Sequence, residues 1–357
     1  MKRDTDMKLL KSGKFWNIVV IIIIASIVMW LSLKDDTAEK LAALASANIW
    51  WVLVAVGVIL FWWISEAWIL QLIAKSEGHK YRFVDALPAA IIGQFYSAAT
   101  PSASGGQFFQ VYFMDRQGFK ITTSVLILTV NFIIYVGSLL VMSVIAAIAS
   151  FSYFDSFMPA LPLWLAIGFA ANAVVYLLIL NAASSKKFHR TLIAFVARIL
   201  KLFRRDQQKI YHTTMKLEKN ITEFRASLNT IKQNKKAYFE FFLVNCLRLV
   251  GFHTLPFFVM LALGVPIVNV PLTLMYCMCG SILIGLITSF IPIPGASGGA
   301  EAFFGLFFMN LFPVDLLGPG LILWRSIQLY FPLIVGGIIT VWYTAYIKKK
   351  PLITEEE

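Results

Sequence analysis

The chain alternates long apolar segments with short polar connections. Six apolar runs approach or exceed the roughly 20 helical residues that cross the hydrocarbon core of a bilayer. They are approximately Phe15–Leu33, Ile49–Ile73, Ile121–Ser150, Leu161–Ala182, Tyr238–Leu263 and Leu321–Ile347. The first run follows a basic N-terminus, and we interpret it as a retained spanning helix rather than a cleaved signal peptide. The pattern predicts an all-α polytopic membrane protein.

Two further apolar segments are interrupted by one repeated hexapeptide pattern. Pro101–Gly106 reads PSASGG, and Pro294–Gly299 reads PGASGG. Within the first segment, Val84–Gln117, the apolar stretch Ala86–Ala99 spans about 21 Å as a helix, which is less than the roughly 30 Å of hydrocarbon. We therefore expect a re-entrant helical hairpin there. The second segment, Pro271–Asn310, has a longer leading arm, so either a hairpin or a full crossing is compatible with its length.

The placement of lysine and arginine predicts the orientation of the chain. The N-terminus, residues 74–82, the loop 184–237 and the C-terminus are basic and should be cytoplasmic, whereas the other connections should be external. Each half then reads span, span, hairpin, span, and the second half is inserted upside down. This predicts an inverted-topology repeat of residues 1–160 and 161–357, with the motifs at 101–106 and 294–299 approaching the membrane centre from opposite faces.

Composition agrees with the membrane assignment. Charged residues make up 14% of the chain, against about a quarter in soluble domains, and the mean hydropathy is +0.76. The net charge of +12 is concentrated in loop 184–237. Cytoplasmic retention alone explains this charge, and attraction to anionic lipid is a second explanation, because the apolar stripe Leu192, Phe195, Val196, Ile199 and Phe203 is typical of an interfacial helix. No recognition motif for nucleic acid accompanies the charge.

The two motifs are candidate anion sites. Ser104 with Gln107 fits a capping box, and Ser297 is the equivalent cap in the second copy. Each motif would then direct a helix N-terminus, with its free N–H groups, at the protein centre. The glycine pairs Gly105–Gly106 and Gly298–Gly299 would allow the backbone to approach a ligand, or alternatively another helix.

Charged side chains within apolar spans are costly and are candidates for function. Arg248 suits a phosphate, and a structural ion pair with Glu66 or Glu301 is the alternative. Glu301 could pair with an ammonium group or with Arg248, or only cap its helix. Glu66 and Arg325 lie toward the ends of their spans, where they could extend to the interface. The sequence contains no P-loop, HExxH or Cys/His cluster, and we expect no metal, no cofactor and no catalytic residue.

Two stretches, Thr100–Met114 (TPSASGGQFFQVYFM) and Ile291–Phe308 (IPIPGASGGAEAFFGLFF), resemble the paired signatures of the flippase-like membrane family. That family includes the transmembrane region of bacterial lysylphosphatidylglycerol synthetases. The residues that match its motifs are Pro294, Gly295, Gly298 and Glu301 in the second copy and Gly105 and Gly106 in the first. Many relatives carry arginine where this chain has Gln110, which would shift phosphate binding toward Arg248.

The resemblance implies an inner-membrane protein of bacteria that moves lipid head groups between leaflets, with both termini in the cytoplasm. Membrane lipids would be its partners, with a separate lipid-modifying enzyme and a homo-oligomer compatible with the sequence. Full synthetases add a cytoplasmic aminoacyltransferase domain, which we do not expect in a chain that ends at Glu357. Lysyl transfer to phosphatidylglycerol and transport of a small solute or ion remain the alternatives.

Overall fold

The computed structural model describes residues 37–103, 105–203, 213–215, 218–219, 221–226, 228, 234–289 and 291–347, and these residues form helices and connecting turns. The helices are α3 (Thr37–Ala45), α4 (Ile49–Ser76), α5 (Phe83–Ala99), η1 (Pro101–Ala103), α6 (Gly105–Arg116), α7 (Ile121–Asp155), α8 (Leu161–Ser184), α9 (Lys186–Phe203), α11 (Lys235–His253), α12 (Leu255–Ala262), α13 (Val270–Thr288), η2 (Pro294–Ala296), α14 (Gly299–Phe308), α15 (Val314–Arg325), η3 (Ser326–Tyr330) and α16 (Phe331–Ile347).

Six helical stretches of the described chain are long and apolar enough to span a membrane, which confirms the all-α polytopic class. They are Ile49–Ser76, Ile121–Asp155, Leu161–Ser184, Lys235–Ala262, Val270–Thr288 and Val314–Tyr346. Five of them coincide with predicted spans. The sixth is α13, whose crossing was left open, and the predicted span Phe15–Leu33 lies outside the described residues.

The span predicted as continuous over Tyr238–Leu263 is divided into α11 and α12 at Thr254. Pro256 lies in the first turn of α12, where a missing N–H is tolerated, but it cannot donate to the preceding turn. The backbone N–H of Thr254 instead closes α11 by bonding to the carbonyls of Gly251 and Phe252. The break leaves Arg248 and His253 near the end of α11.

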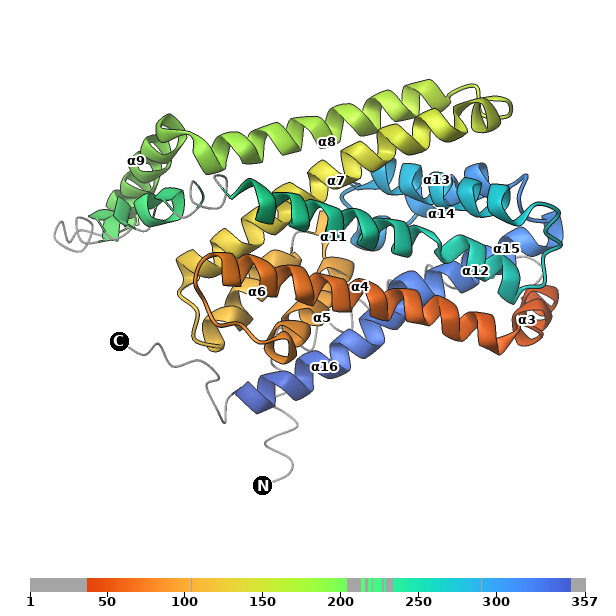
Figure 1. Ribbon diagram of the computed structural model, residues 1–357, viewed down its shortest axis with the longest axis horizontal. Helices are drawn as coiled ribbons and strands as arrows, with labels where there is room; N and C mark the ends of the chain where they lie inside the picture. The colour runs from red at the N-terminus through yellow and green to blue at the C-terminus, as the bar shows by residue number, and fades with distance from the viewer. Residues whose placement is uncertain are drawn as a thin grey trace.

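The two interrupted segments form helical hairpins that point toward each other (Figure 1). The α5–η1–α6 hairpin lies at the same end of the bundle as α9, and α13–η2–α14 lies at the end that carries α3. Within each hairpin the two helices are in contact, and the turns η1 and η2 contact one another. The repeated motifs, 193 positions apart in the chain, therefore lie against one another.

Glycine allows the first hairpin to close tightly. A Cβ atom on Gly106 would lie 2.6 Å from the carbonyl oxygen of Gly93, and it would also collide with the hydroxyl of Ser97. The second hairpin is instead held by aromatic packing, because Phe304, Phe307 and Phe308 of α14 are fully buried in the core. Aromatic residues that follow the motif thus add to the packing of the second hairpin.

The side chain of Gln117 connects the first hairpin to the C-terminal helix α16 by hydrogen bonds. It is fully buried, and its amide Nε2 donates to the carbonyl of Asp85 at 2.7 Å and to the hydroxyl of Tyr343 at 2.6 Å. Its Oε1 accepts from the Tyr81 hydroxyl at 2.8 Å. One side chain therefore joins the end of α6, the start of α5 and α16.

We expect Gln117→Leu to destabilise the protein, because it leaves buried polar partners without hydrogen bonds at a cost of about 1–3 kcal/mol each. The measurement is thermal unfolding in detergent, followed by tryptophan fluorescence. Asp115→Leu, at an exposed position two residues earlier, is the matched control and should leave the melting temperature nearly unchanged. Equal melting temperatures for both variants would contradict this role of Gln117.

Candidate functional site

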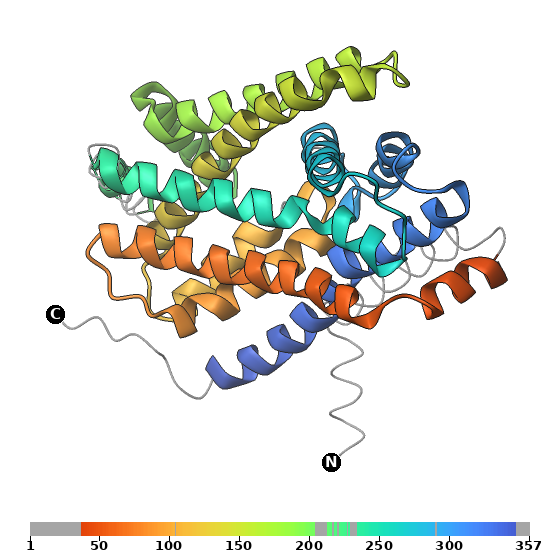
Figure 2. The same ribbon diagram turned by 45° about the vertical axis from the view of Figure 1, so that its right-hand side comes forward.

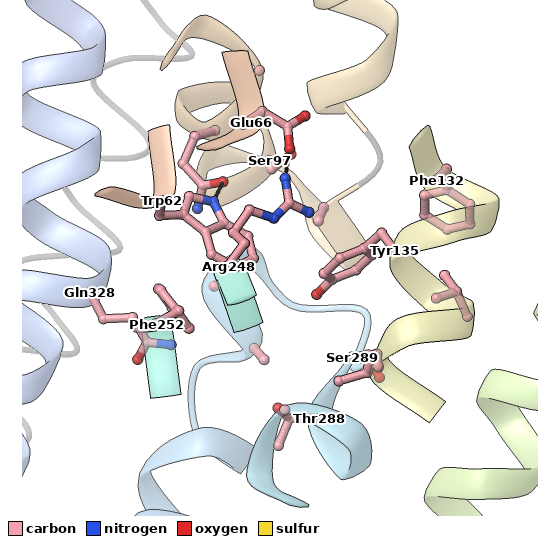
Figure 3. A pocket seen from close by; sticks show the side chains of 18 of the residues that line it. Trp62, Glu66, Ser97, Phe132, Tyr135, Arg248, Phe252, Thr288, Ser289 and Gln328 are labelled. Atoms are coloured by element: carbon pink, nitrogen blue, oxygen red, sulfur yellow. Dashed lines mark hydrogen bonds and ion pairs between the residues drawn. The ribbon is translucent and has the colours of Figure 1, made fainter. Parts of the chain in front are cut away.

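A cavity of about 590 Å³ lies where the two hairpins meet. Its walls come from α4, α5, α6, α7, α8, α11, α13, α14, α15 and η3, and from the motif turns, which contribute Ala103, Gly295 and Ala296. Polar side chains line it within a mostly apolar protein, and they include two arginines, Arg248 and Arg325. Figure 3 shows part of this lining around Arg248.

Arg248 is the most deeply buried charge of the site, with 2% of the residue exposed. Its Nη1 forms an ion pair with Glu66 of α4, drawn in Figure 3. The guanidinium lies over the rings of Trp62 and Tyr135, at 4.3 Å and 5.3 Å from their centroids. A carboxylate and two aromatic faces together offset the desolvation of a buried arginine.

The ion pair of Arg248 is itself supported by α7. Asn131 donates from Nδ2 to Oε1 of Glu66 at 2.8 Å, which orients the carboxylate toward Arg248. The Nε of Arg248 and the Oδ1 of Asn131 are buried, and among the described residues neither has a hydrogen-bond partner. A buried donor without a partner is costly, and the described residues alone do not satisfy the hydrogen-bonding capacity of Arg248 and Asn131.

Arg325 forms a second, separate ion pair. Its Nε lies 2.8 Å from Oε1 of Glu301, and its Nη1 donates to the carbonyl of Gly295 at 3.1 Å. The residue is 5% exposed, and its Nη2 finds no acceptor in the part of the chain that the structure describes. Of the two possibilities that the sequence left open for Arg325, the geometry favours a place in the cavity over extension to the membrane interface, because the tip of the second hairpin supplies its partners inside the protein.

Glu301 holds the tip of the second hairpin as well as Arg325. Its Oε2 accepts from the backbone N–H of Gly298 at 2.6 Å, so the N-cap of α14 is Gly298. The prediction of Ser297 as the cap is wrong, since its hydroxyl donates to the carbonyl of Pro294. Gly295 and Gly298 have φ angles of +61° and +87°, which glycine adopts without strain, and these turns bring the Gly295 carbonyl to Arg325.

A π-helical turn follows directly after Arg325. In η3 the N–H of Phe331 donates to the carbonyl of Ser326, five residues back, and Pro332 cannot continue the ladder of hydrogen bonds. The wider turn contains Gln328, which lines the cavity and whose Oε1 has no partner among the described residues. Local backbone geometry therefore adds Gln328 to Arg248, Asn131 and Arg325 as a fourth lining residue with an unpaired polar atom.

The predicted site residues fall into two groups. Those that line the cavity are Glu66, Gln107, Gln110, Arg248 and Arg325. Those that are not part of the lining are Gly105, Gly106, Pro294, Ser297, Gly298, Gly299 and Glu301, whereas Ser104 lies outside the described residues.

The motif amides differ from the expected anion sites. The N–H of Gly105 donates to the hydroxyl of Thr100 at 2.8 Å, and the N–H of Gly298 is bonded to Glu301. These two donors are therefore satisfied by the protein itself. The motifs contribute by closing the hairpins and by placing Glu301 and Gly295 beside Arg325.

Sequence reasoning missed several residues of the lining. Trp62 lies in an apolar span, where a tryptophan is typical of an interfacial belt, but it covers Arg248. The signal lay in the spacing, because Trp62 and Glu66 on α4, like Asn131 and Tyr135 on α7, are four residues apart and share a helix face. Asn172 of α8 also lines the cavity and donates to the carbonyl of Leu286 at 2.9 Å, which ties α8 to α13.

These features define a polytopic α-helical membrane protein with a polar cavity between two facing hairpins. Residues 17–336 match the family described as the lysylphosphatidylglycerol synthase TM region, and the chain belongs to that family. It is also similar to a UPF0104 membrane protein of Archaeoglobus fulgidus, with 26% identity over 297 residues that cover 81% of this chain and 85% of the relative. The resemblance inferred from the two motif stretches is confirmed.

We expect Arg248 and Glu66 to be energetically coupled. Arg248→Met leaves a buried carboxylate unpaired and Glu66→Gln leaves a buried guanidinium unpaired, so each should cost about 3–5 kcal/mol of unfolding free energy. The double variant should cost clearly less than the sum. The measurement is a double-mutant cycle by denaturant unfolding in detergent.

Glu240→Gln, at an exposed position on the same helix as Arg248, is the control for this cycle and should change stability by less than about 0.5 kcal/mol. Additive losses in the double variant would show that the two groups do not stabilise each other.

Proposed function

We propose that the protein is a flippase-like lipid transporter whose cavity binds a phospholipid or glycolipid head group during its passage between leaflets. The observation that carries this proposal is the presence of two buried arginines in one cavity, each with an N–H group that lacks a partner among the described residues. The planar guanidinium matches phosphate oxygens closely, and charge-assisted hydrogen bonds of this kind are among the strongest in proteins.

The paired carboxylates explain how such a site remains stable without a ligand. Glu66 and Glu301 compensate the arginine charges in the hydrated cavity. A phosphate that enters can engage Arg248 Nε and Arg325 Nη2 while these ion pairs persist. A head group that also carries an ammonium group would find an acceptor in either carboxylate, and lysylphosphatidylglycerol, in keeping with the family description, is one such lipid.

The facing hairpins support movement of the head group across the membrane. A charged head group meets a large barrier in hydrocarbon, and a polar cavity at that depth lowers the barrier while the acyl chains stay in lipid. We place the cavity at the contact of two inverted repeats, 1–160 and 161–357, in a bacterial inner membrane with both termini in the cytoplasm. No covalent step is part of this mechanism.

The test is exchange of fluorescent phospholipids between leaflets of proteoliposomes, measured by chemical quenching of the outer leaflet. We expect the protein to accelerate exchange, and Arg248→Gln and Arg325→Gln to slow it by about tenfold or more, since each removes charge-assisted bonds to phosphate. Arg116→Gln, at an exposed position on α6, is the matched control and should retain the normal rate.

Normal exchange in both cavity variants would refute the site. Absence of exchange for every head group tried, with folded protein, would refute the function. In that case flux of a solute would favour a small-solute transporter, and formation of lysyl lipid from charged tRNA would favour the transferase.

A further inference from the structure

Helix α9 leaves the bundle at the point where α8 ends. Ser185 between them has an extended backbone, with φ of −78° and ψ of 118°, and its hydroxyl accepts from the N–H of Phe188 at 3.2 Å, which starts the new helix. Figure 1 shows α9 turned steeply away from α8 and running across that end of the bundle, and the rotated view in Figure 2 agrees. Since α8 has the length and composition of a spanning helix, α9 begins at the depth of the lipid head groups.

The two sides of α9 differ in what they contact. His189 is buried, with 7% exposed, and faces the protein. Phe188 and Phe195 are 46% and 56% exposed. These two phenylalanines are seven residues apart, so they occupy one face of the helix, two turns from each other. Two large aromatic side chains are thus presented away from the protein on a single face.

The polar side of α9 is uniformly positive. Lys186, Lys187, Arg190 and Arg198 are exposed, and the sequence of α9 contains no acidic residue. Arg198 lies three residues beyond Phe195 and Lys187 lies beside Phe188, so basic groups border the aromatic face. This arrangement of an aromatic face with a basic border is complementary to a membrane surface that carries anionic head groups.

We propose that α9 is an interfacial anchor that binds the surface of the leaflet at this end of the protein through anionic lipid. Phe188 and Phe195 insert below the head groups, and the flanking basic residues contact the lipid phosphates. The membrane is favoured over a protein partner because α9 starts at the bilayer boundary and its whole charge has one sign. This inference is independent of the lipid transport proposed above.

The experiment is hydrogen–deuterium exchange of peptides from residues 186–203 in the intact protein, held in nanodiscs of phosphatidylcholine with or without about one third phosphatidylglycerol. We expect anionic lipid to slow exchange in α9. In the double variant Lys187→Gln/Arg198→Gln, the slowing of exchange by anionic lipid should be about fivefold smaller for each charge removed. Higher salt should reduce this slowing further. Phe188→Gln/Phe195→Gln should abolish it while keeping a helix-forming residue at both positions.

Met215→Gln is the matched control, because Met215 is a large, 49% exposed apolar residue in the same connection but outside α9. It should leave the lipid effect intact. Slow exchange that is independent of lipid charge and unchanged in all variants would show that α9 is held by protein contacts, and fast exchange in both lipids would show that it does not dock. Either result would overturn the proposal.

Discussion

Burial of two guanidinium groups in a protein surrounded by hydrocarbon is the constraint on which the rest of the structure depends. An unpaired charge at that depth is strongly unfavourable, so each arginine needs a carboxylate in a fixed position. Glu66 reaches Arg248 from α4, and Glu301 reaches Arg325 from the start of α14. The first ion pair connects elements far apart in the chain, whereas the second connects the successive helices α14 and α15, and each holds its elements beside the cavity.

The repeated motifs help to position the groups around the arginines through their backbone geometry. In the first copy, glycine lets α6 approach α5 so closely that a side chain at Gly106 would collide with its neighbours. In the second copy, left-handed glycines form the turn whose carbonyl and carboxylate groups hold Arg325. The same sequence motif therefore closes the first hairpin and places the partners of Arg325 in the second. The two halves of the cavity differ chemically although their hairpins face each other.

The sequence predicted the helical class, most spans and both hairpin breaks, because span length and helix-breaking residues act locally. It also identified all four charged residues of the ion pairs. It could not assign the pairing of Glu66 with Arg248 and of Glu301 with Arg325, because that depends on how distant helices pack. The role of Trp62 could not be predicted for the same reason, since a tryptophan in an apolar span is equally typical of an interfacial belt. The π-helical turn after Arg325 likewise reflects Pro332 together with tertiary contacts.

We propose that the cavity between the hairpins holds the phosphate of a lipid head group. This can be tested with an electron cryo-microscopy map of the protein in phospholipid nanodiscs, at a resolution that separates phosphate from water. We expect head-group density in the cavity, with phosphate oxygens about 3 Å from Arg248 Nε or Arg325 Nη2. A cavity that contains water alone, with all lipid phosphates confined to the two membrane surfaces, would contradict it.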